Sequence, residues 1–112
     1  MKRNARVDSN QKRVVEALRK MGYYVQHTHQ LKGCFDFLIG KTGTWIPIEL
    51  KDSEKMPKKF FSMNRREQHE YLLSKLTNDE RVFYDRIKAR KLPYILEITA
   101  ERIDIEFKKW TT

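Results

Sequence analysis

Residues 35–52, FDFLIGKTGTWIPIELKD, contain the feature that most constrains the fold, because they form two strand-like runs around a short turn. The runs FDFLIG (35–40) and TWIPIELK (44–51) are rich in aromatic and β-branched residues. The Gly-Lys-Thr-Gly sequence that joins them is a turn signal. The segment therefore predicts a β-hairpin.

Charged residues lie inside this hairpin, where a half-buried strand would carry apolar ones. Side chains alternate along a strand, so Glu49 and Lys51 share one face, while residues 46, 48 and 50 form the buried face. A tight hairpin symmetric about Thr42 places Asp36 opposite roughly position 48. Glu49 is then its neighbour across the ladder, and two carboxylates and a lysine converge at one place.

Apolar periodicity and capping signals predict the elements around the hairpin. The pairs Asn64/Glu67 and Thr77/Glu80 have the spacing of capping boxes, and the tail at 100–110 fits either a strand or a helix. The predicted order is a helix at 8–22, strands at 23–29, 35–40 and 44–51, helices at 64–75 and 78–91, and a strand at 92–98. This order predicts an α/β fold, a mixed sheet flanked by helices, in a single domain over residues 1–112.

The net charge indicates the kind of partner. The chain has 24 Lys and Arg residues against 15 Asp and Glu, a formal charge of +9. A domain this basic favours a polyanionic partner, most often nucleic acid, over the alternative of a surface tuned only for solubility. No apolar run is long enough to span a membrane, and no signal peptide is evident. With a single cysteine, Cys34, we expect a reducing, cytoplasmic location.

Asp36, Glu49 and Lys51 suggest a particular chemistry. Two adjacent carboxylates repel each other, and a hard cation such as Mg²⁺ relieves that repulsion through its preference for oxygen ligands. Such an ion can bind a phosphodiester and activate the attacking water. Lys51 can orient that water or neutralise the phosphate. The competing interpretation is a surface salt bridge between Lys51 and one carboxylate, which contributes little.

The same residues resemble the signature of the PD-(D/E)XK nucleases. Asp36 and Glu49-Leu50-Lys51 match its core, and NQKRVVEALRKMGYYV, KGCFDFLIG and IELKD resemble small phage and archaeal members. These include Holliday-junction resolvases and virus-type replication-repair nucleases. The likeness covers residues 8–52. It implies a restriction-endonuclease-like αβββαβ core at roughly 8–52 and 76–98, with an insertion at 53–75.

The resemblance also implies roles for individual residues. Asp36 and Glu49 would bind Mg²⁺ or Mn²⁺, with the carbonyl of Leu50 as a further ligand, and Lys51 would assist the attacking water. Phe35 replaces the usual proline. Where many members have a glutamate on the first helix, this chain has Gln11, which lies on the same helical face as the apolar residues. It would hydrogen-bond a metal-bound water or serve only as a polar residue near the helix start.

Several other residues are candidates for accessory roles. Relatives often carry a glutamine after the Glu-x-Lys strand, and here either Gln68 or Glu80 takes that place. His29 is a candidate for a catalytic or phosphate contact, or is an ordinary strand residue. The pair Phe60-Phe61 belongs to a DNA-contacting loop or to an insertion with a hydrophobic anchor. The candidate DNA-binding residues are Lys32, Lys55, Lys58, Lys59, Arg65 and Arg66.

These features together predict a metal-dependent endodeoxyribonuclease that resolves four-way (Holliday) DNA junctions. No base-reading module is visible, so we expect recognition of DNA shape through phosphate contacts. Two symmetric cuts need two active sites, which implies a homodimer. Two alternatives remain open. One is a flap-cutting or nicking repair nuclease of the same superfamily, and the other is a non-catalytic DNA-binding module.

Overall fold

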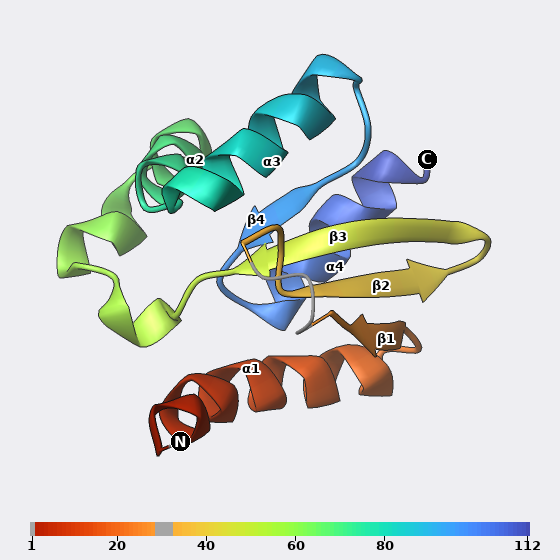
Figure 1. The fold of residues 1–112 in the computed structure, drawn as a ribbon, viewed down its shortest axis with the longest axis horizontal. Coiled ribbons are helices and arrows are strands. Elements are labelled where there is room, and N and C mark those ends of the chain that lie inside the picture. The colour runs from red at the N-terminus through yellow and green to blue at the C-terminus, as the bar shows by residue number, and fades with distance from the viewer. Residues whose placement is uncertain (1, 29–32) are drawn as a thin grey trace.

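The computed structural model describes residues 2–28 and 33–112, which form four α-helices, two short 3₁₀-helices and one four-stranded sheet (Figure 1). In chain order the elements are α1 (Lys2–Lys20), β1 (Tyr24–His27), β2 (Phe37–Lys41), β3 (Thr44–Leu50), η1 (Ser53–Lys55), η2 (Lys58–Ser62), α2 (Arg65–Ser74), α3 (Asn78–Ala89), β4 (Ile95–Glu97) and α4 (Ala100–Trp110). The strand order is β1-β2-β3-β4, antiparallel except for the parallel pair of β3 and β4. The predicted α/β fold with a mixed sheet is confirmed.

The first helix is longer than its sequence signals predicted. It begins at Lys2, whereas the predicted start was at residue 8, because residues 2–7 contain no proline or glycine to interrupt a helix. It ends at Lys20, two residues before the predicted end. Gly22 has a positive φ of 98°, and the backbone N–H of Tyr23 donates to the carbonyl oxygen of Leu18 at 3.1 Å.

The hairpin turn consists of Thr42 and Gly43, which both have positive φ, as a tight two-residue turn between twisted strands requires. The ladder is centred between these two residues and pairs Phe37 with Ile48. The prediction of a ladder centred on Thr42 is therefore wrong by half a residue. The backbone N–H of Asp36 nevertheless donates to the carbonyl oxygen of Ile48 at 2.9 Å, so Asp36 lies where the prediction placed it.

Both predicted capping boxes are present, at Asn64/Glu67 before α2 and at Thr77/Glu80 before α3. The C-terminal tail, which the sequence left undecided, is the helix α4 with Thr99 as its N-cap. The predicted strands 23–29 and 92–98 are shorter in the structure, as β1 and β4. No described helix is both long and apolar enough to cross a membrane.

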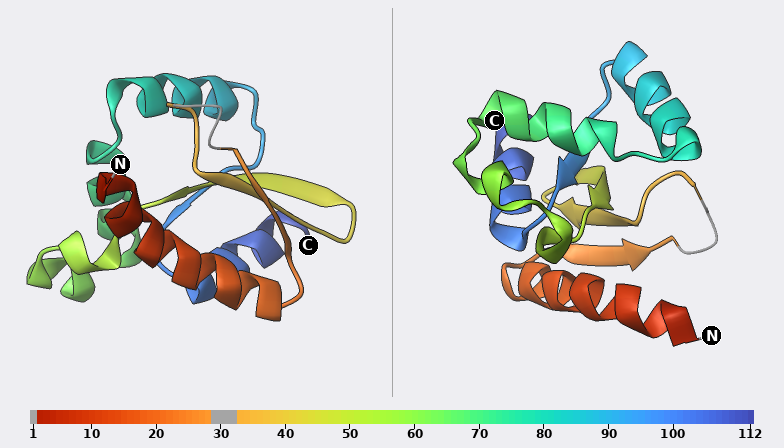
Figure 2. Two further views of the ribbon diagram at one scale, coloured as in Figure 1. Left: turned by 60° about the horizontal axis from the view of Figure 1, so that its bottom comes forward. Right: turned by 90° about the vertical axis from the view of Figure 1, so that its left-hand side faces the viewer.

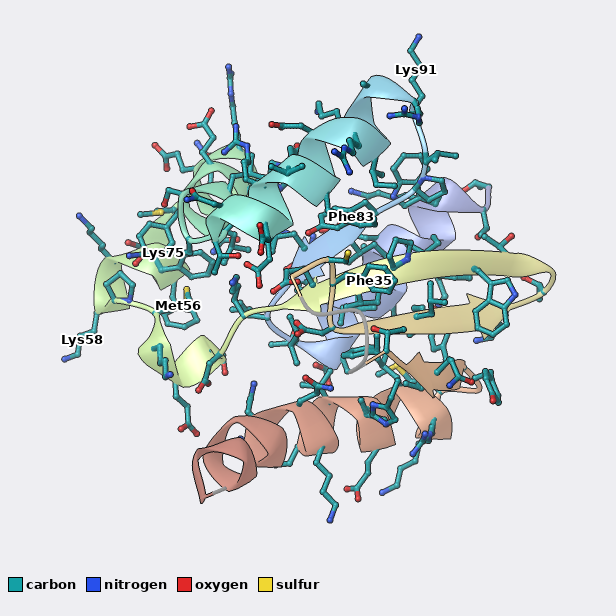
Figure 3. All side chains as sticks on the ribbon, viewed as in Figure 1. Phe35, Met56, Lys58, Lys75, Phe83 and Lys91 are labelled. Carbon is teal, nitrogen blue, oxygen red and sulfur yellow. The ribbon has the colours of Figure 1, made fainter. Side chains whose placement is uncertain are left out.

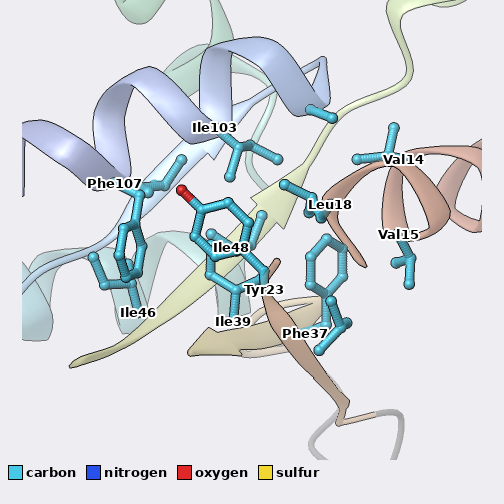
Figure 4. Packing of buried hydrophobic residues seen from close by; sticks show 13 residues of the cluster. Val14, Val15, Leu18, Tyr23, Phe37, Ile39, Ile46, Ile48, Ile103 and Phe107 are labelled. Carbon is cyan, nitrogen blue, oxygen red and sulfur yellow. The ribbon is translucent and has the colours of Figure 1, made fainter. Parts of the chain in front are cut away.

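Helices cover both faces of the sheet, and each face has its own apolar cluster (Figure 2). On one face, α1 and α4 pack over β1, β2 and β3, with Leu18, Ile48 and Ile103 fully buried (Figure 4). On the other, Phe60 and Leu72 from the predicted insertion at 53–75 pack with residues of α3 and β4. The segment from η1 to α2 therefore forms part of the second helical layer.

Candidate active site

Asp36 is fixed to the end of β3 by two backbone hydrogen bonds. Its own N–H donates to the carbonyl oxygen of Ile48, and its Oδ2 accepts from the N–H of Leu50 at 2.7 Å. The residue precedes the first residue of β2, so its side chain lies at the rim of the sheet. The carboxylate is therefore positioned by backbone geometry and needs no neighbouring side chain to orient it.

Glu49 is the buried carboxylate of the site, with only 2% of the residue exposed. It follows Ile48, which packs against α1 and α4, so its side chain points to the opposite face of the sheet. Its Oε2 lies 3.4 Å from Nζ of Lys51. Its Oε1 is buried and has no hydrogen-bond partner among the residues that the structure describes. A buried polar oxygen without a partner is costly, so this atom is suited to bind a cation or a proton.

Lys51 lies between two carboxylates. Its Nζ is 3.0 Å from Oε1 of Glu80 and 3.4 Å from Oε2 of Glu49, and its side chain is largely buried. Its backbone N–H donates to the carbonyl oxygen of Glu97 on β4 at 3.0 Å. Both the main chain and the ammonium group are therefore held in place.

Glu80 comes from the first turn of α3 and has two roles. Its Oε1 accepts from the backbone N–H of Thr77 at 3.0 Å, which completes the capping box, and from Nζ of Lys51 at 3.0 Å. The rival candidate, Gln68, donates to the carbonyl oxygen of Phe60 and accepts from Arg65, on the other helix of this layer. Of the two, Glu80 is the one that lies at the site.

Burial and mutual repulsion shift the pKa values of these groups. Burial, followed by the negative charges of Asp36 and Glu80, raises the pKa of Glu49 to about 9. Burial also raises the pKa of Asp36, although the Leu50 N–H opposes it. For Glu80, burial acts in the same direction, but the hydrogen bonds from Thr77 and Lys51 outweigh it and lower the pKa. Three carboxylates thus share one ammonium, and the excess negative charge favours a bound cation or proton.

The carboxylates of the site fit a metal ion that takes few protein ligands. Within the described residues, no three His, Cys, Asp or Glu side chains are arranged to hold an ion by themselves. Mg²⁺, however, usually takes only one or two carboxylates and completes its shell with water and substrate phosphate. Asp36 and Glu49, with the unpartnered Oε1 of Glu49, fit that requirement.

The remaining predicted site residues are more loosely connected to this centre. Gln11 is partly buried on α1 and makes no side-chain hydrogen bond to another described residue, so its role stays a prediction. The backbone of Leu50 reaches the site through its bond to Asp36, and its carbonyl as a ligand also stays a prediction. His29 and Lys32 lie outside the described residues.

The predicted DNA-binding residues fall into two groups. Lys55, Lys58 and Lys59 are exposed on η1 and η2 and form no ion pair with any described residue. Arg65 is different, because its Nη2 lies 2.6 Å from Oε2 of the buried Glu97 and holds α2 against β4. Arg66 is exposed and pairs with Glu70 one turn further along α2 at 3.7 Å.

Three residues at or near the site were missed by sequence reasoning. Phe83 of α3 packs on Phe35 with ring centroids 5.2 Å apart and so links α3 to the segment that carries Asp36 (Figure 3). Tyr94 is buried, and its hydroxyl has no partner in the described part of the chain. Glu97 holds Lys51 through its carbonyl. Of these three residues, only Glu97 stands out in the sequence, because it is an acidic residue inside the apolar run LPYILEI.

The chain matches no protein-family model, no curated protein and no solved structure.

Proposed function

We propose that this protein is a metal-dependent endodeoxyribonuclease that cuts branched DNA, with the four-way junction as its substrate. The observation that carries the proposal is the convergence of Asp36, Glu49 and Lys51 at the end of β3, with an unpartnered buried oxygen on Glu49. A purely structural ion pair would satisfy both oxygens of this side chain in the interior, because a buried polar atom without a partner is costly.

The residues of the site would have different roles in phosphodiester hydrolysis. Asp36 and Glu49 would hold Mg²⁺ or Mn²⁺, with the Leu50 carbonyl as a further ligand. When bound, such a cation stabilises the charge that develops on the phosphate and activates water. An ammonium has three N–H donors, and Glu49 and Glu80 engage at most two of those on Lys51. The third is available to orient the attacking water or to bind a phosphate oxygen.

The charge distribution supports a DNA substrate. The net charge of +9 attracts a polyanion, and the lysines at 55, 58 and 59 extend from the segment that directly follows Lys51. Phosphate contacts of this kind position DNA without reading its sequence. The proposal therefore assigns recognition to the shape of the branch. The proposed location is the cytoplasm, that of a bacterial or archaeal host cell if the protein is phage-encoded.

A four-way junction has two equivalent scissile phosphates, so its symmetric resolution requires a homodimer with two-fold symmetry. We expect light scattering at micromolar protein to give a mass near twice 13.6 kDa. A monomeric mass that persists with bound junction would contradict the dimer.

A panel of labelled DNA substrates tests the function. Four-way junction, flap and linear duplex are each incubated with the protein in Mg²⁺ and in EDTA. The proposal predicts paired nicks in the junction, in Mg²⁺ only, with little cleavage of linear duplex. Preferential cleavage of flaps would favour a repair nuclease. Tight binding of all branched substrates without cleavage in Mg²⁺ or Mn²⁺ would favour a non-catalytic DNA-binding module.

A further inference from the structure

Two adjacent phenylalanines between β3 and α2 have opposite environments. Phe60 is 2% exposed and packs in the apolar cluster on the α2–α3 face of the sheet, whereas Phe61 is 59% exposed. Both lie on η2, in the lobe formed by residues 53–62 that projects beyond the end of β3 (Figure 1). The buried ring explains how the lobe is anchored, but it does not explain why the next residue presents a second ring to solvent.

The exposed ring is held in a defined orientation. Phe60 packs against Tyr71 at a centroid distance of 5.7 Å, and its carbonyl oxygen accepts from Nε2 of Gln68 at 3.0 Å. Phe61 packs edge-to-face on Phe60, with centroids 5.4 Å apart and planes at 84°. The backbone N–H of Met63 also donates to the Phe60 carbonyl oxygen, at 3.2 Å. With its backbone anchored and one ring edge in contact, Phe61 loses less conformational entropy on binding than a side chain without such contacts would.

The surroundings of Phe61 are cationic. Lys55, Lys58 and Lys59 are exposed on the same lobe without an ion pair to any described residue, and Lys58 points away from the molecule (Figure 3). The lobe's acidic residue Glu54 lies 3.8 Å from Arg13 of α1. A fixed aromatic ring beside several unpaired cations is complementary to a strand that carries both phosphates and a free base face.

Another exposed aromatic pair provides a comparison. Tyr24 and Trp45 pack edge-to-face at 5.7 Å at the turn end of the hairpin. The neighbouring Lys41 already has contacts within the protein, because its Nζ donates to the carbonyl oxygen of Met21 at 2.9 Å and lies over the ring of Tyr23. Exposed aromatic area alone is ordinary on a protein surface. The lobe differs in combining it with unpaired cations.

We infer that Phe61 stacks on one unpaired base beside the branch point of the DNA substrate, while the lobe lysines contact the flanking phosphates. Bases inside a duplex already stack on both sides, so a ring on the protein surface gains a partner only where a base is unpaired. The lobe follows directly from the strand that ends at Leu50, which places it beside the proposed cleavage site. The inference rests on the proposed function and narrows its substrate to branched DNA with at least one unpaired base at the branch point. A fully paired four-way junction offers such a base only when a pair at the branch point opens.

The test is a binding experiment in EDTA, so that it does not depend on cleavage. Fluorescence anisotropy measures the Kd of the full chain for a DNA fork, for the same fork with one base at a time replaced by an abasic site, and for linear duplex. Wild type should lose about tenfold in affinity at one abasic position. Phe61→Ala should bind the intact fork more weakly than wild type by a similar factor and should bind linear duplex as tightly as wild type does. Its affinity for the fork should no longer depend on that abasic position.

Three variants keep the result interpretable. Phe61→Trp should retain fork affinity because it still stacks, whereas Phe61→Leu, which is apolar without a π face, should behave like Phe61→Ala. Trp45→Ala, at the other exposed aromatic pair, should bind as wild type does. Equal losses on fork and duplex, or additive losses for Phe61→Ala and the abasic sites, would overturn the inference.

The outcomes also separate this inference from the proposed nuclease function. If the forks bind through Phe61 but are never cut in Mg²⁺ or Mn²⁺, the stacking contact stands and the nuclease proposal fails. If branched DNA is cut while Phe61→Ala binds normally, the nuclease proposal stands and the stacking contact is wrong.

Discussion

The backbone N–H of Leu50 donates to Oδ2 of Asp36 at 2.7 Å, so a main-chain bond joins the residue before β2 to the last residue of β3. Together with the bond from the Asp36 N–H to the carbonyl oxygen of Ile48, this contact brings the two carboxylates of the site together, because Glu49 lies between Ile48 and Leu50. Asp36 therefore contributes both a hydrogen-bond acceptor and a negative charge, and substitutions can remove the two separately.

Asp36→Asn should keep the structure and remove the charge. The amide oxygen can still accept from Leu50, so the free energy of unfolding should change little, whereas Asp36→Ala leaves that N–H without a partner and should cost about 1–3 kcal/mol. Both variants should bind junction DNA in EDTA as tightly as wild type or more so, because removing a negative charge favours DNA approach. Denaturant unfolding and anisotropy measure the two effects. Weakened junction binding by Asp36→Asn would show that Asp36 contributes to affinity and would contradict the separation.

Lys51 should be required as an ammonium group. Lys51→Ala removes the cation that Glu49 and Glu80 share, and we expect cleavage to slow by at least about 100-fold, the lower limit for losing one donor that stabilises the transition state. Lys51→Arg should rescue poorly, because a planar guanidinium does not fit a site built around a compact ammonium. Single-turnover rates on a junction measure this, with the exposed Lys20→Ala as the control. Near-normal turnover by Lys51→Arg would show that any positive charge suffices at this position and would contradict the requirement for an ammonium group.

Glu49 makes the metal-free protein sensitive to pH. Its folded-state pKa is raised from the ordinary 4.5 to about 9, so the folded state holds the proton more tightly than the unfolded chain does. The associated stability is present in full below about pH 4.5 and is lost as pH rises towards 9. Glu49→Gln, which cannot ionise, should lose less stability over this range. Burial and Glu97 raise the pKa of Glu106 to about 8, so this residue also makes the free energy of unfolding fall as pH rises. Denaturant unfolding from pH 4.5 to 9 should therefore compare the two proteins, and the difference between their free energies of unfolding reports on Glu49.

The same pair of proteins tests metal binding without reference to cleavage. Mg²⁺ binds only the folded state, so at pH 8 it should raise the Tm of wild type and leave that of Glu49→Gln nearly unchanged. Differential scanning fluorimetry with Mg²⁺, Mn²⁺ and EDTA measures the shift. An equal shift in both proteins would place the cation elsewhere.

Glu80 should act through Lys51 and not through its capping bond. Glu80→Ala removes both, and Glu67→Ala removes only the matching capping bond at the start of α2, so each should cost about 1 kcal/mol of stability. Only Glu80→Ala should also slow cleavage, and Glu80→Gln, which can still accept from Lys51, should restore most of it. A loss of cleavage in Glu67→Ala would indicate that general helix stability explains the effect.

The sequence predicted those parts of the fold that depend on local chemistry. Both capping boxes involve residues three apart and formed as predicted. A tight turn also formed inside the predicted Gly-Lys-Thr-Gly segment, although its centre lies half a residue beyond Thr42. The tail could not be decided, because Ile103, Ile105 and Phe107 alternate as in a strand. In α4, Ile103 and Phe107 are buried one helical turn apart, while Ile105 is exposed.

Parts of the candidate site depend on contacts between distant residues. The pairing of Lys51 with Glu80 spans 29 residues and that of Arg65 with Glu97 spans 32. Sequence could name Glu80 and Gln68 as rivals, but only the docking of α3 on the sheet places Glu80 at the site. The sequence also predicted that Arg65 contacts DNA, and this stays a prediction. It gave no sign of the ion pair with the buried Glu97, which only the packing of α2 on β4 brings within reach.

The most direct test is the rate of cleavage of a synthetic four-way junction as Mg²⁺ is titrated, for wild type, Asp36→Asn and Glu49→Gln, with the exposed Glu70→Gln as the matched control. The account predicts Mg²⁺-dependent paired cuts by wild type and Glu70→Gln, none in EDTA, and rates near background for the two site variants. Full cleavage by Asp36→Asn or Glu49→Gln, or cleavage that is unaffected by EDTA, would contradict it.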